Sequence, residues 1–184
     1  TLSLHDALPI NIKRKRKTKL EVSLEKSDSY TYPVRLERLQ YINKITPKHI
    51  SFLYSVEMHY LHSEAIRSFI NGQFVAVLLL SHSFIEHWLE DRIEESKIKR
   101  YGNHSLANII KAMKEKNSAN ISLLDKIDRL RKIRNPFVHY KPSNYEFSVM
   151  NLSIPNKTMP DDLLYKEAKE AISLLYQVCI TKFN

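Results

Sequence analysis

The sequence predicts an all-α protein, an up-and-down bundle of about five helices with a small β-hairpin and strand added to it. The helices are predicted from residue 47 onward, where apolar residues recur every three or four positions in segments joined by short polar connections. The β-addition is predicted from two stretches, residues 19–36 and 145–154, in which apolar and polar residues alternate.

The first of these stretches, residues 19–36, has the pattern of a β-hairpin. Its apolar residues occupy every second position on either side of a KSDS turn (Leu20, Val22 and Leu24, then Tyr30, Tyr32 and Val34). Two origins remain open for it: the end of a truncated upstream region, or an extra β-element of this domain. The second stretch, residues 145–154, is predicted to be a strand that pairs with this hairpin.

The first two helices are predicted at about residues 47–70 and 73–97. Thr46 is suited to cap the first helix, Pro47 to its first turn, and the Asn71-Gly72 pair to its end. The second helix begins with FVAVLLL, which is apolar on every side. Such a helix is expected in the middle of a bundle.

Three further helices are predicted. One covers residues 105–116, another begins near Ser122, and the last covers residues 161–182, where two aspartates occupy the first turn. The helix that begins near Ser122 has a regular apolar stripe (Leu123, Ile127, Leu130 and Phe137), with Arg134 at the missing step. Pro136 is predicted to end or kink this helix.

Composition limits the class of protein. Hydrophobic residues make up 43% of the chain and charged residues 27%, as in a folded soluble domain. Only two glycines occur, which excludes glycine-rich phosphate loops, and the lone Cys179 favours a reducing, cytoplasmic setting. No apolar run approaches the roughly 20 residues of a membrane helix. His59 and His62 share a helix face, but two ligands do not make a metal site, so neither a metal nor another cofactor is predicted.

The N-terminal region has its own character. Residues 1–10 resemble the translated end of a common sequencing adapter and are interpreted as an artefact. Residues 11–46 are predicted to be a basic tail with the hairpin, and residues 47–184 the helical domain. The tail contributes much of the net charge of +9. A basic run of this kind is more often a solvated tail than a nuclear signal or an RNA clamp.

The sequence RNPFVH provides the candidate site. Arg134 occupies a step of an apolar stripe, where a charge is costly unless it is paired or used. Asn135 offers an amide, and His139 a group that titrates near neutral pH. Three basic residues precede them on the same helix and are candidate RNA contacts (Arg129, Arg131 and Lys132). On an ideal helix, residues five apart diverge by about 140°, so Arg134 and His139 converge only if Pro136 alters the path. The alternative interpretation is a buried Arg134 in a salt bridge, with His139 on the surface.

RNPFVH and the upstream segment AVLLLSHSFIEHWLEDRI resemble the HEPN superfamily (higher eukaryotes and prokaryotes nucleotide-binding), whose hallmark is R-x(4–6)-H at the end of a bundle helix. The resemblance covers about residues 47–183, although only the short motif is specific. It implies a metal-independent endoribonuclease of toxin or antiviral type, with a composite site at a homodimer interface and an antitoxin protein as a further partner. Non-catalytic members imply the alternative of a module that binds a nucleotide, RNA or a partner protein. A third interpretation is a helical dimerisation piece of a larger protein.

The resemblance also implies roles for the motif. His139 would take the ribose 2′-hydroxyl proton or protonate the leaving 5′-oxygen. Arg134 would stabilise charge on the phosphate, and Asn135 would orient His139 or the phosphate. Glu86, one helical turn after His82, is a candidate support for Arg134, the alternative being a carboxylate that faces solvent or a dimer rim.

Overall fold

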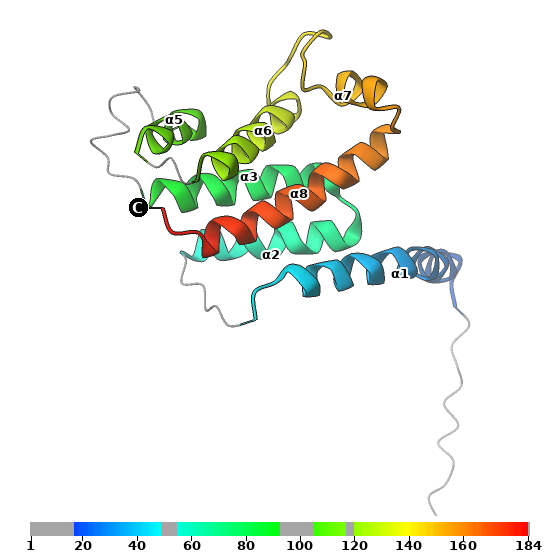
Figure 1. Cartoon of the computed structure of the whole chain (residues 1–184). Helices are drawn as coiled ribbons and strands as arrows, with labels where there is room; N and C mark the ends of the chain where they lie inside the picture. The colour runs from blue at the N-terminus through cyan, green and yellow to red at the C-terminus, as the bar shows by residue number, and fades with distance from the viewer. Residues whose placement is uncertain (1–16, 49–54, 93–104, 117–119, 184) are drawn as a thin grey trace, which may run out of the picture. The chain divides into compact units, whose positions relative to one another are not determined.

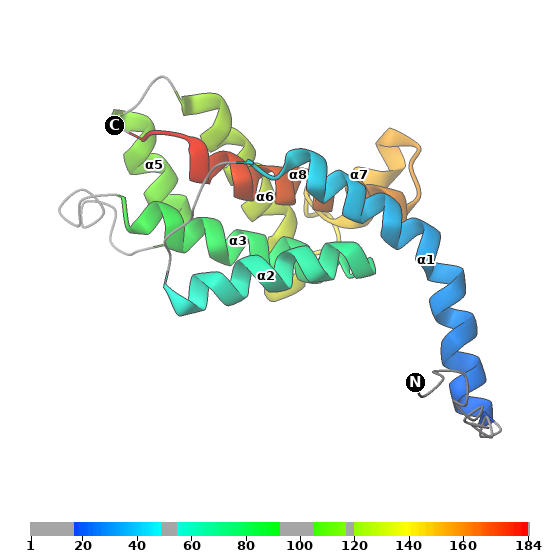
Figure 2. The ribbon, with the colours of Figure 1, turned by 90° about the horizontal axis from the view of Figure 1, so that it is seen from below.

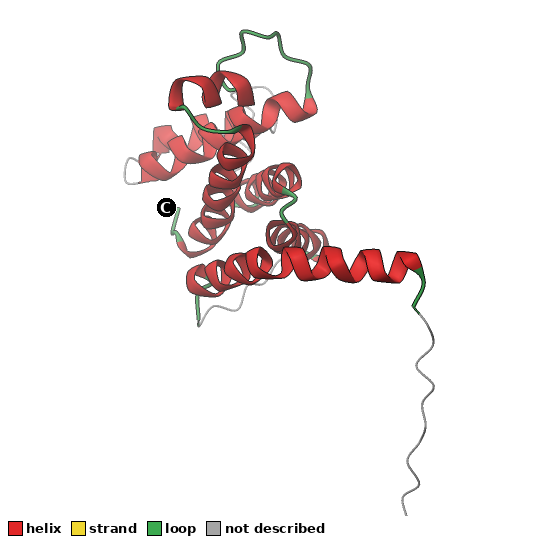
Figure 3. Cartoon of the chain, turned by 90° about the vertical axis from the view of Figure 1, so that its right-hand side faces the viewer, coloured by secondary structure: helices red, strands yellow, loops and turns green. Residues whose placement is uncertain are grey.

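The structure is a computed structural model that describes residues 17–48, 55–92, 105–116 and 120–183. These residues form seven helices and no strand (Figures 1 and 3). The all-α prediction is therefore confirmed, and the predicted β-addition is wrong. The helices are α1 (Lys19–Ile45), α2 (Val56–Asn71), α3 (Phe74–Glu90), α5 (Leu106–Lys116), α6 (Ile121–Val138), α7 (Val149–Asn156) and α8 (Pro160–Ile180).

The chain divides into two compact units, Thr1–Val34 and Arg35–Asn184, and the boundary falls within α1. The described part of the first unit is the start of α1, where a hairpin was predicted. A capping box begins this helix: the Glu21 backbone N–H donates to Thr18 Oγ1 at 3.2 Å, and the Thr18 N–H donates to the Glu21 carboxylate at 2.6 Å. This reciprocal pair satisfies donors that a helix start otherwise leaves open.

The apolar alternation that suggested a hairpin buries little. Leu20 is 82% exposed, Leu24 65% and Tyr30 86%, so no sheet face forms from them. In the second unit, the inward side of α1 follows helical spacing instead, through Arg35, Arg38, Ile42 and Ile45. Because two of these four residues are arginines, the sequence shows no apolar stripe with helical spacing here.

Helix α2 begins later than predicted. Ser55 is its cap, accepting a hydrogen bond from the Met58 N–H at 3.3 Å. Thr46 instead follows α1 and donates its hydroxyl back to the Ile42 carbonyl at 2.8 Å, and the predicted start beyond residue 48 lies outside the described residues. The predicted stop at Gly72 is confirmed: its φ of +79° is left-handed.

Helix α3 is the centre of the second unit, as its apolar sequence predicted. It packs against α2, α5, α6 and α8 (Figure 2). Its buried apolar side chains are Val77, Leu78, Phe84, Ile85, Trp88 and Leu89. The Trp88 indole N–H also donates to the Val178 carbonyl of α8 at 2.9 Å. The last part of the predicted range, residues 93–97, lies outside the described residues. Of the described helices, none is long and apolar enough to cross a membrane.

Helices α5 and α8 match the predicted ranges closely, whereas α6 continues past Pro136 to Val138. Pro136 has no N–H to donate to the Lys132 carbonyl one turn earlier. The Tyr145 hydroxyl donates to that carbonyl instead, at 3.0 Å. The helix therefore tolerates its proline because a side chain from the following loop satisfies the freed acceptor.

Residues 145–154, predicted as a strand, form a turn and then α7. The Ser148 hydroxyl caps this helix by accepting from the Asn151 N–H at 3.2 Å. The Asn151 side-chain amide also donates to the Tyr145 carbonyl at 2.8 Å. Met150 and Ile154 are mostly exposed, so the alternation in this segment, like that of residues 19–36, does not mark a buried sheet face.

Replacing Tyr145 with phenylalanine tests its role in supporting the end of α6. The ring is kept, but the Lys132 carbonyl loses its donor, so we expect the free energy of unfolding to fall by about 1 kcal/mol. Urea denaturation followed by circular dichroism measures this change. The matched control is Tyr140→Phe, since Tyr140 is 93% exposed, and it should leave stability unchanged. Equal stability of both variants would show that the carbonyl does not depend on Tyr145.

Candidate functional site

A cavity of about 290 Å³ brings the predicted motif together. Three helices meet around it: α3, the start of α5 and the end of α6. We call it the motif cavity. Its lining residues are His82, Glu86, Ser105, Leu106, Ala107, Arg131, Arg134, Asn135 and His139. Five of the seven site residues predicted from the sequence therefore line one cavity, and Arg129 and Lys132 lie outside it.

The motif converges because the helix ends just before the histidine. The His139 N–H still donates to the Asn135 carbonyl at 2.9 Å, but its φ of −129° and ψ of 138° are extended rather than helical. The side chain thus leaves the direction it would have on a continued helix. Pro136 lies within the helix, and the change of path comes three residues later. His139 is exposed at the mouth of the cavity and Arg134 is half-buried.

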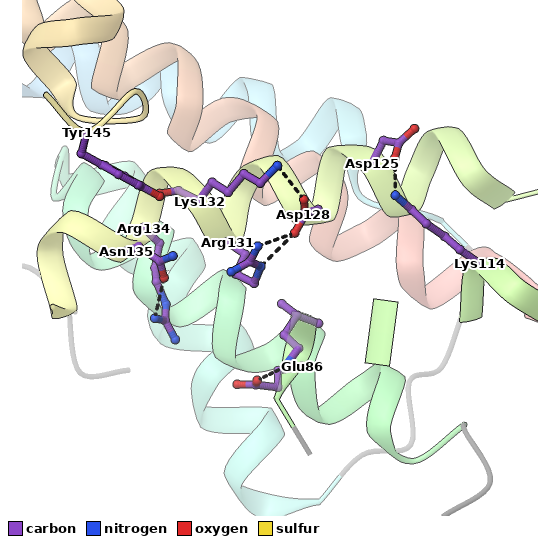
Figure 4. A network of polar contacts seen from close by, with 10 residues as sticks. Glu86, Lys114, Asp125, Asp128, Arg131, Lys132, Arg134, Asn135 and Tyr145 are labelled. Carbon is purple, nitrogen blue, oxygen red and sulfur yellow. Dashed lines mark hydrogen bonds and ion pairs between the residues drawn. The ribbon is translucent and has the colours of Figure 1, made fainter. Parts of the chain in front are cut away.

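Arg134 is held by polar neighbours. Its Nη1 donates to Asn135 Oδ1 at 3.2 Å (Figure 4). Its Nη2 lies 3.4 Å from His82 Nδ1. In the described part of the chain, no carboxylate forms an ion pair with Arg134, whereas His139 is exposed, as the alternative interpretation expects. Burial lowers the pKa of Arg134 below its ordinary value; the charge of Glu86 opposes this shift and that of Arg131 adds to it. The guanidinium remains a cation with donors left for a ligand.

His82 is a site residue that the sequence analysis did not single out. The residue is 1% exposed. Burial, together with the charges of Arg134 and Arg131, lowers the pKa of His82 to about 3. The ring is therefore neutral near pH 7, and its Nδ1 can accept the hydrogen bond from Arg134. A histidine on an apolar helix one turn before Glu86 was the available signal.

Glu86 lies in the motif cavity but does not pair directly with Arg134. Its Oε1 accepts a hydrogen bond from the Leu106 N–H at 2.7 Å, which holds the first turn of α5 against α3. Its Oε2 is 3.9 Å from His82 Nδ1, which is not an ion pair because His82 is neutral. The charge of Glu86 acts on Arg134 only by opposing the lowering of the Arg134 pKa by burial.

The other basic residues of α6 point in different directions. Asp128 pairs with Arg131 at 2.8 Å and with Lys132 at 2.9 Å (Figure 4). Burial raises the pKa of Asp128, but hydrogen bonds from Lys132 and Arg131 outweigh that effect and leave it lowered. Arg129 instead forms a two-pronged pair with Glu167 of α8. Only Arg131 of the three predicted RNA contacts therefore lines the motif cavity.

The chemistry available in the motif cavity is proton transfer and anion binding. In the described residues, His59 and His62 included, no three histidine, cysteine or acidic side chains gather as metal ligands would. Comparisons with protein-family models, with curated proteins and with solved structures gave no match to this chain. The proposal for its function therefore rests on the motif and the geometry of this cavity.

Proposed function

We propose that this chain is a metal-independent endoribonuclease with a HEPN-type helical bundle. The observation that carries the proposal is the convergence of Arg134, Asn135 and His139 on one cavity of the second unit. A forked cation and an imidazole at one solvent-accessible site are suited to a phosphodiester. The substrate is RNA under this proposal, because the nucleophile is the ribose 2′-hydroxyl.

The reaction follows from these groups. The 2′-oxygen attacks the adjacent phosphorus, a base takes the 2′ proton, the bond to the 5′-oxygen breaks, and an acid protonates that oxygen. The products are a 2′,3′-cyclic phosphate and a 5′-hydroxyl. Arg134 stabilises the charge that develops on the phosphate oxygens. His139 serves as the base or the acid.

A second copy of the chain supplies the missing group. Among the described residues, the other histidine that lines the motif cavity is His82, which is buried and neutral with a pKa of about 3, so it cannot give a proton near pH 7. A homodimer would place a second His139 near the same phosphate, one as base and one as acid. A toxin or antiviral role, with an antitoxin protein as partner, follows from the resemblance to the HEPN superfamily alone.

The test is cleavage of a labelled RNA by the purified chain in excess chelator. We expect cleavage to persist and to leave 2′,3′-cyclic phosphate ends. A nucleotide with 2′-deoxyribose should not be cleaved. Chromatography with mass spectrometry of the products distinguishes these ends. Cleavage that requires a divalent metal, or that proceeds at 2′-deoxyribose, would contradict the mechanism. Binding of RNA without cleavage would instead identify the non-catalytic alternative.

A further inference from the structure

A second cavity, of about 500 Å³, adjoins the motif cavity. The two share Arg131 and Asn135 as lining residues, so they lie side by side on α6. We call the second one the Tyr145 groove. Besides the shared pair, it is lined by Lys132, Lys141, Tyr145 and Phe147, together with Pro142, Asn144 and Glu146. It lies between the end of α6 and the turn that leads into α7.

The groove is positively charged. Its lining includes Arg131, Lys132 and Lys141, against one acid, Glu146. Asp128 engages the first two of these cations. Lys141 differs, because within the described part of the chain it pairs with no carboxylate and its Nζ lies 5.5 Å from the Tyr145 ring centroid. It is the cation most available to a phosphate.

Two aromatic rings lie among these cations. The centroids of Tyr145 and Phe147 are 6.0 Å apart, and the Lys132 Nζ lies 5.3 Å from the Phe147 centroid. The hydrogen bond from the Tyr145 hydroxyl to the Lys132 carbonyl fixes one ring. A fixed ring beside a cation suits a nucleotide, because the base can stack on the ring and the phosphate can pair with the ammonium group.

We infer that the Tyr145 groove binds the base and phosphate of the nucleotide next to the one held in the motif cavity. The ligand class is single-stranded RNA, because a paired base would not be free to stack on a ring. The assignment of the neighbouring cavity to the cleaved phosphate rests on the proposed function. The evidence for the groove is its own lining, its charge and the two lining residues that it shares with the motif cavity.

The experiment measures the affinity of the full chain for a fluorescent 2′-O-methyl oligoribonucleotide of about eight nucleotides. This probe lacks the free 2′-hydroxyl and is not cleaved, so binding is read by anisotropy without turnover. We expect Lys141→Gln to raise Kd about fivefold and to lower the salt dependence of log Kd by about one ion. Phe147→Leu, which keeps an apolar side chain without a ring, should raise Kd about fivefold with no change in salt dependence.

Lys44→Gln is the matched control. Lys44 is exposed at the end of α1 and lines neither cavity, so its variant should bind within about twofold of the wild type. An equal loss of affinity in Lys44→Gln and Lys141→Gln would contradict RNA binding by the groove. Unchanged binding by both groove variants would contradict it as well. Circular dichroism checks the fold of Phe147→Leu, and Lys141→Gln changes only a side chain at the surface of the groove.

The outcomes separate the two proposals. If the wild type cleaves RNA and both groove variants bind and cleave RNA as it does, the groove does not bind RNA and the proposed function stands. If the wild type cleaves no RNA while the groove variants lose affinity, the groove stands and the proposed function fails. If the probe does not bind to the wild type at all, the groove is not an RNA site.

Discussion

Replacing His139 with alanine should lower RNA cleavage by about a thousandfold, and Arg134→Ala should do the same. Of the two histidines that line the motif cavity within the described residues, His139 is the exposed one, and His139→Ala removes it. Arg134→Ala removes the forked donors that would stabilise charge on the phosphate. The measurement is the single-turnover rate on a labelled RNA at saturating protein. Undiminished cleavage by either variant would contradict the assigned role.

Two controls accompany these variants. Arg134→Lys keeps the charge but not the planar fork, so we expect most of the rate to stay lost. Because His139 is exposed, its alanine variant should unfold within about 0.5 kcal/mol of the wild type. A large loss of stability would mean that the lost activity reflects misfolding. Urea denaturation distinguishes these two causes.

Mixing experiments test whether the site is composite. An excess of the His139→Ala chain is added to the wild type under conditions that allow subunits to exchange. If each phosphate needs a histidine from both copies, mixed dimers are inactive and activity falls below the value set by dilution. If each copy acts alone, activity stays proportional to the amount of wild type. Light scattering establishes the oligomeric state of both proteins.

The fold was predictable where burial follows the apolar pattern. The segment FVAVLLL identified α3 as the central helix, and regular apolar spacing identified α5 and α8. The failure at α1 has a specific cause: the alternation of apolar residues predicted a hairpin, whereas Thr18 and Glu21 form a capping box, which favours the start of a helix. The inward residues Arg35 and Arg38 also concealed the helical stripe of the second unit. For α1, the local capping sequence was therefore a better guide to secondary structure than the apolar pattern.

The site was predictable in its motif but not in its setting. The buried residues of α6 are Leu124, Ile127, Leu130 and Ile133, so Arg134 lies at the edge of the buried stripe rather than within it. That position leaves it half-buried and able to reach both a cavity and His82. No spacing rule relates His82 to Arg134, because they are brought together by the packing of α3 on α6. Nor does local sequence show that Tyr145 would satisfy the carbonyl freed by Pro136.

The second large effect is expected from His82, through the pH dependence of stability. In the folded chain its pKa is about 3, well below the value of about 6.5 that an unfolded chain gives a histidine. Between these two pKa values, His82 is therefore protonated in the unfolded chain and neutral in the folded chain. The stability associated with neutral His82 is complete above about pH 6.5 and is lost as the pH falls toward 3, by up to about 1.4 kcal/mol per pH unit.

His82→Gln removes the pH-dependent contribution of His82 to stability and keeps an amide oxygen that can accept a hydrogen bond from Arg134. Between pH 7 and pH 5, the wild type should lose about 2 kcal/mol more of its free energy of unfolding than the variant does. Urea denaturation across this range measures the difference. His62, whose pKa burial also lowers, is present in both proteins, so its contribution cancels. His87→Gln, at an exposed position on the same helix, should follow the wild type. Parallel pH curves for the wild type and His82→Gln would show that His82 accepts a proton within the folded chain.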